Sequence, residues 1–177
     1  MSYEKDIMFR INSSDLWPDF ESPDFLDILD ELAEESLKKN TVEGALASVL
    51  IYHQLSEECL LLLLQSAQFY IQLSIFPAEI TFPERKRKMF GQLIDEVKNT
   101  MSFTNKAEIL ELATLLNKHR IDLVHKLASR QTLDDLISQA TEVKNIYSKL
   151  FTNFDDAYDG FCLEFKDFRK DKFIDYE

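Results

Sequence analysis

The sequence predicts an all-α protein, built as an up-and-down bundle of four to five helices. Three glycines and four prolines in 177 residues leave few turn-forming residues, which argues against hairpins and barrels. Leu, Glu, Lys, Ala and Gln are abundant, and all of them favour helices. Apolar residues also recur at helical spacing through most of the chain. A chain of this length can bury a core without a metal or a disulfide.

We divide the chain into an irregular N-terminal arm (1–21), one helical bundle domain (22–168) and a frayed tail (169–177). The arm lacks helical periodicity. Its large aromatic side chains are expected to dock it onto the bundle: Phe9, Trp17 and Phe20.

The first bundle helix is expected to begin at Ser22-Pro23, a capping residue followed by proline at the first helical position. It should end at Asn40, where Thr41 caps the next helix. Apolar residues at helical spacing give its predicted inward face: Phe25, Ile28, Leu29, Leu32 and Leu37.

The second helix is expected from Val42 to Ser74 and is the most apolar part of the chain. His53, Gln54, Glu57 and Glu58 stand in its centre, where they would be costly in lipid. We therefore expect a central helix of the bundle and no contact with a membrane. A loop bounded by two prolines (76–84) should follow.

The third helix should begin near Arg85. The fourth should open at Asn105, with Glu108 three residues later completing a capping box. The fifth should begin after Thr132, capped with Asp135, and it either continues through Gly160 or breaks there. Its apolar stripe is Leu136, Ala140, Val143, Tyr147, Leu150, Phe154, Ala157, Phe161, Phe165 and Phe168.

The net charge of −12 argues against a general nucleic-acid coat and against affinity for an anionic membrane. Its distribution is uneven: residues 1–40 carry −7, 41–84 carry −5, 85–130 carry +5 and 131–177 carry −5.

The two cysteines are expected to be reduced, buried thiols, and the first residues lack a signal-peptide pattern. We expect a cytoplasmic protein.

One residue interrupts the apolar stripe of the fourth helix. In LLNKHRIDLVHKLAS (115–129), Arg120 takes a position on the buried side, and His125 follows five residues later. At about 100° per residue, Asn117 lies about 60° and His125 about 140° from Arg120. Arg120 and His125 of one straight helix therefore cannot both grip a single phosphate. Two copies of the helix across a twofold axis could, which predicts a homodimer.

These side chains have the chemistry for RNA cleavage without a metal or another cofactor. A histidine such as His125 can take and return a proton near neutral pH. The Arg120 guanidinium matches phosphate oxygens and can stabilise charge on phosphorus. Asn117 could orient the sugar or the imidazole. The alternative is that Arg120 pairs with a buried acid and His125 lies on the surface.

The stretch LLNKHRIDLVH resembles the signature of the HEPN superfamily (higher eukaryotes and prokaryotes nucleotide-binding domains), a Leu-Asn-x-x-Arg-x-x-x-x-His motif on a late helix. The order of elements is also similar to the mannitol-operon-repressor-like branch. The resemblance covers about residues 22–160, and about ten residues carry it. It implies an all-α homodimer with the motif helices at the interface. Many members are toxin or defence RNases, and others are inactive binding modules.

The resemblance implies Arg120 and His125 as the catalytic pair, with Asn117 as the upstream polar residue. Ile121 departs from the pattern, because active members commonly have a polar residue directly after the arginine. Glu57 or Glu58 could support the Arg120 guanidinium. Basic residues are expected to contact RNA: Arg85, Lys86, Arg87, Lys88 and Lys126.

The sequence thus favours an RNA-binding protein, which would be a metal-independent endoribonuclease of the toxin or defence type if Arg120 and His125 converge. An antitoxin or a regulatory protein would then be a second partner, in addition to RNA. The alternative is a non-catalytic interaction or regulatory module in which the motif only supports dimerisation. His53 with Glu57 offers too few ligands for a metal site, and the region around Gly160 lacks two oxygen ligands of a calcium loop.

Overall fold

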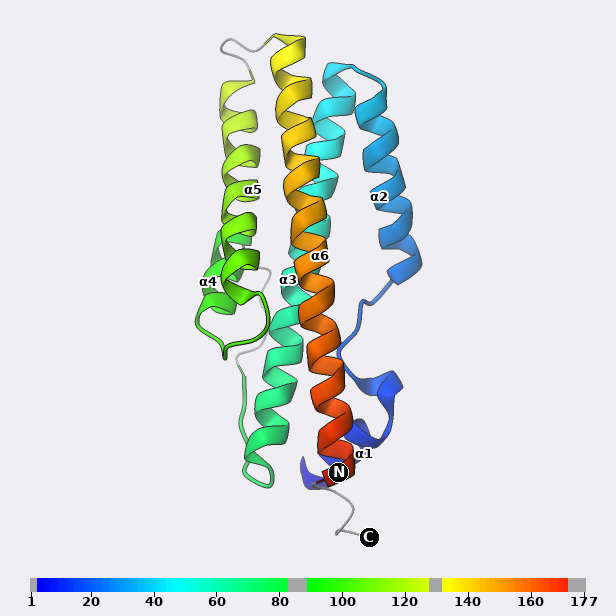
Figure 1. The fold of residues 1–177 in the computed structure, drawn as a ribbon, viewed down its shortest axis with the longest axis vertical. Helices are drawn as coiled ribbons and strands as arrows, with labels where there is room; N and C mark the ends of the chain where they lie inside the picture. Colours follow the sequence, from blue (N-terminus) through cyan, green and yellow to red (C-terminus); the bar gives the residue numbers. More distant parts are fainter. Residues whose placement is uncertain (1–2, 83–88, 128–131, 172–177) are drawn as a thin grey trace.

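The computed structural model describes residues 3–82, 89–127 and 132–171, which form an all-α bundle. Two long helices, α3 (Val42–Ile75) and α6 (Leu133–Asp171), run through its centre (Figure 1). Helix α2 (Pro23–Lys38) packs along one side of this pair and α5 (Lys106–Lys126) along the other. The chain runs up α2, down α3, up α5 and down α6 (Figure 1), so the predicted up-and-down bundle is confirmed.

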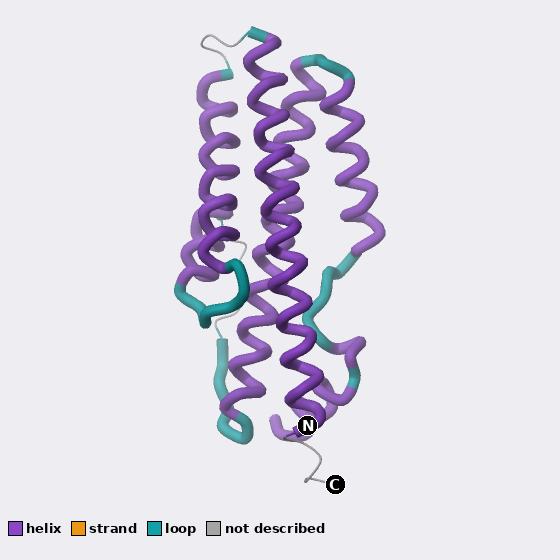
Figure 2. The backbone as a smooth tube through the Cα atoms, viewed as in Figure 1, coloured by secondary structure: helices purple, strands orange, loops and turns teal. Residues whose placement is uncertain are grey.

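Two shorter helices complete the described part of the chain. Helix α4 (Phe90–Lys98) packs against α3 and α5, and α1 (Tyr3–Asn12) packs against α6. A short 3₁₀ turn, Ser14–Leu16, follows α1, and described loops join it to α2, α2 to α3 and α4 to α5 (Figure 2). The described residues thus hold six α-helices, which is more than the predicted four to five.

The N-terminal arm was predicted to be irregular, and this was wrong for most of it. Tyr3–Asn12 is helical because Ile7 and Ile11, one turn apart, are both fully buried against the bundle. The charged end of Arg10 also lies 4.4 Å from the centre of the Phe69 ring on α3. These contacts stabilise a helix whose sequence alone has weak amphipathic character.

Two of the three aromatic residues expected to dock this segment do so. The Trp17 ring lies edge-on to Phe165 of α6 at 5.5 Å, and the Phe20 ring lies 5.6 Å from Phe154. Phe9, in contrast, is 62 % exposed, so its predicted docking is wrong. It points away from the face of α1 that carries Ile7 and Ile11.

The predicted inward face of α2 is confirmed for Leu29 and Leu37 and wrong for its other three residues. Phe25, Ile28 and Leu32 are exposed, although they repeat at helical spacing. The buried face uses small residues instead, with Ala33 fully buried and Ser36 nearly so, which brings α2 close to α3. Larger residues of this face are partly buried: Leu26, Leu29 and Leu37. Both stripes have the helical period, and close packing selected the one with small side chains.

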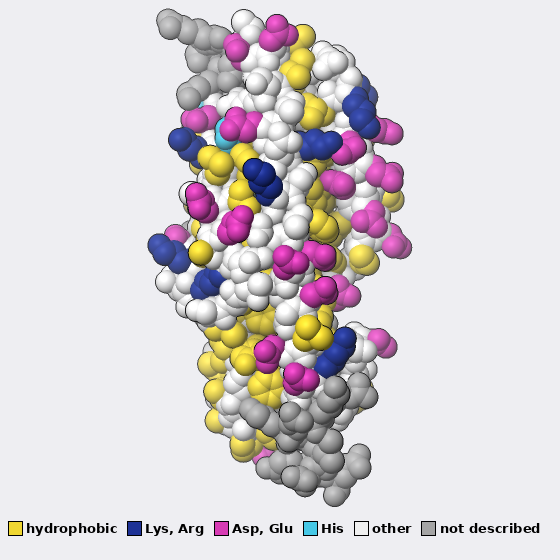
Figure 3. Space-filling model, in the orientation of Figure 1, with side chains coloured by type: hydrophobic (Ala, Val, Ile, Leu, Met, Phe, Trp, Pro, Cys, Tyr) yellow, Lys and Arg dark blue, Asp and Glu magenta, His cyan; other side chains and the backbone are white. Residues whose placement is uncertain are grey.

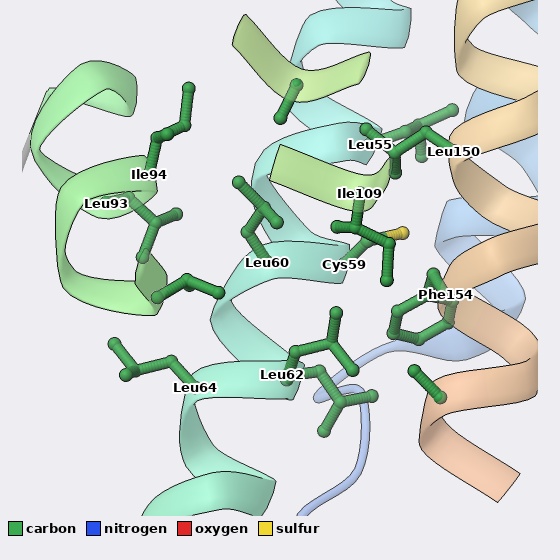
Figure 4. Packing of buried hydrophobic residues seen from close by; sticks show 14 of the residues in the cluster. Leu55, Cys59, Leu60, Leu62, Leu64, Leu93, Ile94, Ile109, Leu150 and Phe154 are labelled. Carbon is green, nitrogen blue, oxygen red and sulfur yellow. The ribbon is translucent and has the colours of Figure 1, made fainter. Parts of the chain in front are cut away.

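Helix α3 is the core helix of the bundle, as predicted. It begins after Thr41, whose hydroxyl accepts a hydrogen bond from the Gly44 amide at 3.1 Å. Figure 4 shows Leu55 beside Leu150 of α6, while Leu60 lies on the side that faces Leu93 of α4. By length and composition α3 could cross a membrane, but 56 % of its most apolar window is buried in the bundle. That burial is expected for a central helix surrounded by others.

Helix α6 confirms the predicted stripe, because all ten of its predicted apolar residues from Leu136 to Phe168 belong to the buried core. It runs unbroken through Gly160. The predicted cap is also confirmed: the Asp135 amide donates to the Thr132 hydroxyl, and the Asp135 carboxylate accepts from Thr132. The predicted frayed tail is helical up to Asp171, and residues 172–177 lie outside the described part.

The start of α4 and the cap of α5 differ from prediction. The predicted start of α4 at Arg85 lies outside the described residues, and Met89 has an extended backbone directly before Phe90. Helix α5 begins after Asn105 as expected, but no capping box forms there. Asn105 has a left-handed backbone (φ 57°), and its side chain donates to Asp156 of α6 at 3.3 Å instead of capping the helix.

Candidate functional site

The three predicted site residues on α5 separate onto two faces of the helix. Arg120 is partly buried and lies on the face that carries the buried residues Leu116 and Leu123. Asn117 is also partly buried, whereas His125 is exposed. Since five residues turn a helix by about 140° beyond a full turn, the guanidinium and the imidazole leave α5 in different directions. One chain alone therefore does not bring Arg120 and His125 together.

The structure instead brings Arg120 and Asn117 to a different histidine, His53 on α3. His53 is 9 % exposed, and its pKa responds both to the charge of Arg120 and to the Asn117 carboxamide. The ring of Phe90, at the start of α4, covers it at 4.4 Å between ring centres. We call His53, Asn117 and Arg120 the polar cluster. Three helices, α3, α4 and α5, thus surround a small group of polar side chains.

The polar cluster has unused hydrogen-bonding capacity. Three of its buried atoms have no hydrogen-bond partner in the structure: His53 Nε2, Asn117 Oδ1 and Arg120 Nε. The Asn117 side chain lies close enough to the imidazole to raise the pKa of His53. Buried polar atoms without partners are costly, so such a group usually has a function or a bound water. Nearby, a β-carbon on Gly91 would lie 3.8 Å from the Asn117 amide nitrogen.

Burial and charge together keep the His53 imidazole neutral. Burial lowers the pKa of His53, the positive charge of Arg120 lowers it further, and Asn117 opposes part of the change, giving a pKa of about 4. At neutral pH the positive charge of the cluster is therefore that of Arg120. The neutral imidazole carries one nitrogen that can donate and one that can accept a hydrogen bond.

The predicted supporting carboxylates lie on the same helix as His53. Glu57, one turn after His53, is partly buried, and its predicted support of Arg120 stays a prediction. Glu58 accepts a hydrogen bond from Gln54 at 3.0 Å. That partner lies on α3 itself, one turn earlier, and Glu58 projects about 140° away from His53 around the helix. Of the two candidates, Glu57 is thus the one on the side of the polar cluster.

Five basic residues were predicted to contact RNA. Arg85, Lys86, Arg87 and Lys88 lie outside the described residues, as does the side chain of Lys126 at the end of α5. Their role stays a prediction. His119 is partly buried, with Nε2 at 3.6 Å from a carboxylate oxygen of Glu142 on α6. Within the described ranges, no group of three or more His, Cys, Asp or Glu residues could hold a metal ion.

The sequence analysis considered His53 only with Glu57, as a rejected metal site, and missed its place beside Arg120. A signal was present, because His53 and Arg120 both occupy the apolar stripe of their helices. A buried polar side chain is costly without a partner, so polar residues on the inward stripes of two helices are expected to lie together. Which polar residues of α3 and α5 lie together depends on how the two helices are aligned along the bundle axis, and the sequence does not specify that alignment.

Comparison of the chain with protein families, with curated proteins and with solved structures finds no significant match. The resemblance to the HEPN superfamily therefore depends on the motif residues of α5 and on the order of the helices.

Proposed function

We propose that this chain is a HEPN-like RNA-binding protein that uses α5, with Arg120 as its phosphate-binding residue. The observation that carries this proposal is the unpaired Nε of Arg120 beside the neutral His53 and the unpaired Oδ1 of Asn117. A guanidinium with a free donor in a partly dry site binds an anion more strongly than one in water. The positive charge of residues 85–130 would attract RNA to this side of an otherwise acidic chain.

Cleavage would need two chains, because Arg120 and His125 of one chain point in different directions. In a twofold pair, His125 of one chain would meet Arg120 of the other. His125 would accept the proton of a ribose 2′-hydroxyl, whose oxygen attacks the phosphorus. Arg120 would stabilise the charge on the phosphate, and His125 would return the proton to the departing 5′-oxygen. The products would be a 2′,3′-cyclic phosphate and a 5′-hydroxyl end.

Purified protein incubated with end-labelled single-stranded RNA, in the presence of a chelator, tests this function. We expect cleavage by the wild type, and loss of at least 100-fold in rate for His125→Ala with RNA binding retained. Arg120→Ala should lose both binding and cleavage, and Lys149→Ala, exposed on α6 and outside residues 85–130, is the matched control. RNA that the wild type neither binds nor cleaves would remove this function.

A second candidate, a non-catalytic interaction or regulatory module, is favoured by Ile121. This residue follows Arg120, is 41 % exposed and gives the helix an apolar surface where active relatives commonly have a polar group. On this account Arg120 and His125 would support only an interface, with a second copy or with a regulatory protein. Two results together would support this candidate. The wild type would form a dimer and cleave no RNA, and Ile121→Asp would lose that dimer, as measured by light scattering.

A further inference from the structure

A pocket of about 310 Å³ lies on the other side of the bundle, between α2, α3 and α6. It is separate from the polar cluster and shares no residue with it. Its apolar wall includes Leu26 of α2, Leu55 of α3 and Phe151 of α6. Figure 3 shows hydrophobic side chains in the furrow between α6 and α2, with acidic side chains on the α2 side. The volume suits a small organic molecule.

The polar side of the pocket is acidic. Asp27, Asp30 and Glu34 of α2 repeat at a spacing of three and four residues, so they lie on one face of the helix and all line the pocket. The single basic residue of the lining, Lys144 of α6, forms an ion pair with Glu34. Asp27 and Asp30 therefore give the pocket a net negative charge.

The Asp30 carboxylate lies in an environment that disfavours its charge. Burial raises its pKa, and the charge of Glu34 raises it further, while Lys144 opposes part of this effect. A carboxylate that is partly removed from water and surrounded by like charges is stabilised by any cation that approaches it. The pocket thus holds negative charge that the chain itself does not fully neutralise.

Aromatic rings form the floor, and one of them carries an unpaired hydroxyl. The rings of Tyr52 on α3 and Tyr147 on α6 lie 4.9 Å apart and are tilted by 31°. Tyr52 is only 1 % exposed, and its hydroxyl has no hydrogen-bond partner. The charges of Asp30 and Glu34 add to burial in raising the pKa of Tyr52, which places its hydroxyl on the acidic side of the pocket. A buried hydroxyl is expected to have a partner.

We propose that this pocket binds a small organic cation, an ammonium group attached to an aromatic or aliphatic body. The ammonium would lie between Asp27 and Asp30 and donate a hydrogen bond to the Tyr52 hydroxyl oxygen. The faces of the Tyr52 and Tyr147 rings would add attraction for the charge. The hydrocarbon part would cover Leu26, Leu55 and Phe151 and remove their surface from water.

Other classes of ligand fit this pocket less well. An anion would meet two uncompensated carboxylates. A neutral apolar molecule would cover those carboxylates without pairing them and would leave the Tyr52 hydroxyl unsatisfied. A bare metal ion would gain little from the aromatic floor and would not use the apolar wall. Only a ligand with a positive end and an apolar end uses both halves of the lining.

Three probes of one shape and different charge test the proposal: 2-phenylethylamine, 2-phenylethanol and phenylacetate. Binding to the full chain at neutral pH is measured by titration calorimetry and by the NMR signals of the pocket. We expect saturable binding of the amine, at least tenfold weaker binding of the alcohol, and none of phenylacetate. Failure of the amine to bind, or equal binding of amine and alcohol, would overturn the proposal.

Variants locate the binding in the pocket. Asp30→Asn keeps the shape of the side chain and should weaken binding of the amine at least tenfold, whereas Asp155→Asn, exposed on α6, should leave it unchanged. Tyr52→Phe keeps the ring and should weaken the amine severalfold without affecting the alcohol. Circular dichroism confirms the fold of each variant. Unchanged affinity in Asp30→Asn, or binding only of a lysine-rich peptide to this face, would contradict a small-cation site.

Discussion

The imidazole of His53 on α3 and the guanidinium of Arg120 on α5 share one buried cluster, in which the charge of Arg120 adds to burial in lowering the pKa of His53 to about 4. Both side chains interrupt apolar stripes, and both retain a buried nitrogen without a hydrogen-bond partner. A neutral histidine next to a permanent cation avoids placing two positive charges in the interior. The pair therefore fixes which residue carries the charge of the cluster at neutral pH.

The low pKa of His53 predicts a pH dependence of stability. Between pH 6.5, its ordinary pKa, and about pH 4, its folded pKa, the unfolded chain binds a proton that the folded chain does not. Folding stability should therefore be greatest above this range and fall as the pH decreases through it, by up to about 3 kcal/mol from this residue. Urea unfolding at pH 7.5 and pH 4.5 measures the change.

Substitution separates this effect from that of the carboxylates that titrate in the same range. His53→Gln should show a clearly smaller loss of stability between the two pH values, and His125→Gln, exposed on α5, is the matched control. The ring signals of His53 in an NMR titration should stay those of a neutral imidazole down to about pH 4. A His53 that protonates near pH 6.5 in the folded protein would contradict the buried cluster.

Two tyrosines predict opposite effects of the same substitution. The Tyr52 hydroxyl is buried without a partner, so Tyr52→Phe should be neutral or raise the free energy of unfolding by up to about 1 kcal/mol. The Tyr158 hydroxyl donates to the Pro18 carbonyl oxygen at 2.7 Å, so Tyr158→Phe should lower it by about 1 kcal/mol. Thermal unfolding of both variants checks the sign, and a loss in Tyr52→Phe equal to that in Tyr158→Phe would contradict the structure.

Two glycines in helices also differ. A β-carbon on Gly44 would overlap the backbone oxygen of Ser36, where α2 ends against the start of α3. Gly44→Ala should therefore destabilise the protein by roughly 1–3 kcal/mol, although alanine favours helices. A β-carbon on Gly160 would meet its nearest neighbour, the Thr104 hydroxyl, at 3.7 Å. Gly160→Ala should thus stabilise α6 by roughly 0.5–1 kcal/mol. Chemical unfolding of both variants measures the difference, and equal changes in the free energy of unfolding for Gly44→Ala and Gly160→Ala would contradict the structure.

The cysteines should differ in reactivity. Cys59 is 2 % exposed, and burial raises the pKa of its thiol far above the ordinary value. Cys162 is partly buried, and burial also raises its pKa, but solvent reaches it. In native protein, iodoacetamide should modify Cys162 slowly and Cys59 only after unfolding. Mass spectrometry of the alkylated protein measures this order, and rapid labelling of Cys59 would mean that α3 is not enclosed.

The sequence predicted the fold well where one side of a helix alone is apolar. The stripe of α6 from Leu136 to Phe168 has no competitor, and every member is buried. Helix α2 offers two stripes, and the larger residues Phe25 and Ile28 were chosen wrongly. Nothing in the sequence states that the small residue Ala33 allows the closer approach to α3.

The candidate site was predicted only in part for the same reason. The unusual position of Arg120 is visible in the sequence, because it interrupts an apolar period on one helix. Its neighbour His53 lies 67 residues earlier, and their contact depends on how α3 and α5 are aligned along the bundle. The pocket beneath Asp30 likewise requires three helices, since no single one carries the carboxylates, the tyrosines and the apolar wall. Such tertiary combinations leave no local pattern.

Mixing two inactive variants tests most directly the claim that Arg120 and His125 act across a pair of chains. Arg120→Ala and His125→Ala are each purified, mixed, unfolded and refolded together, and assayed for RNA cleavage. If the site is shared, random pairing makes half of the dimers mixed, and each mixed dimer contains one intact and one inactive site. The mixture should therefore regain about a quarter of the wild-type rate. An active wild type whose mixed variants stay as inactive as each variant alone would contradict the shared site.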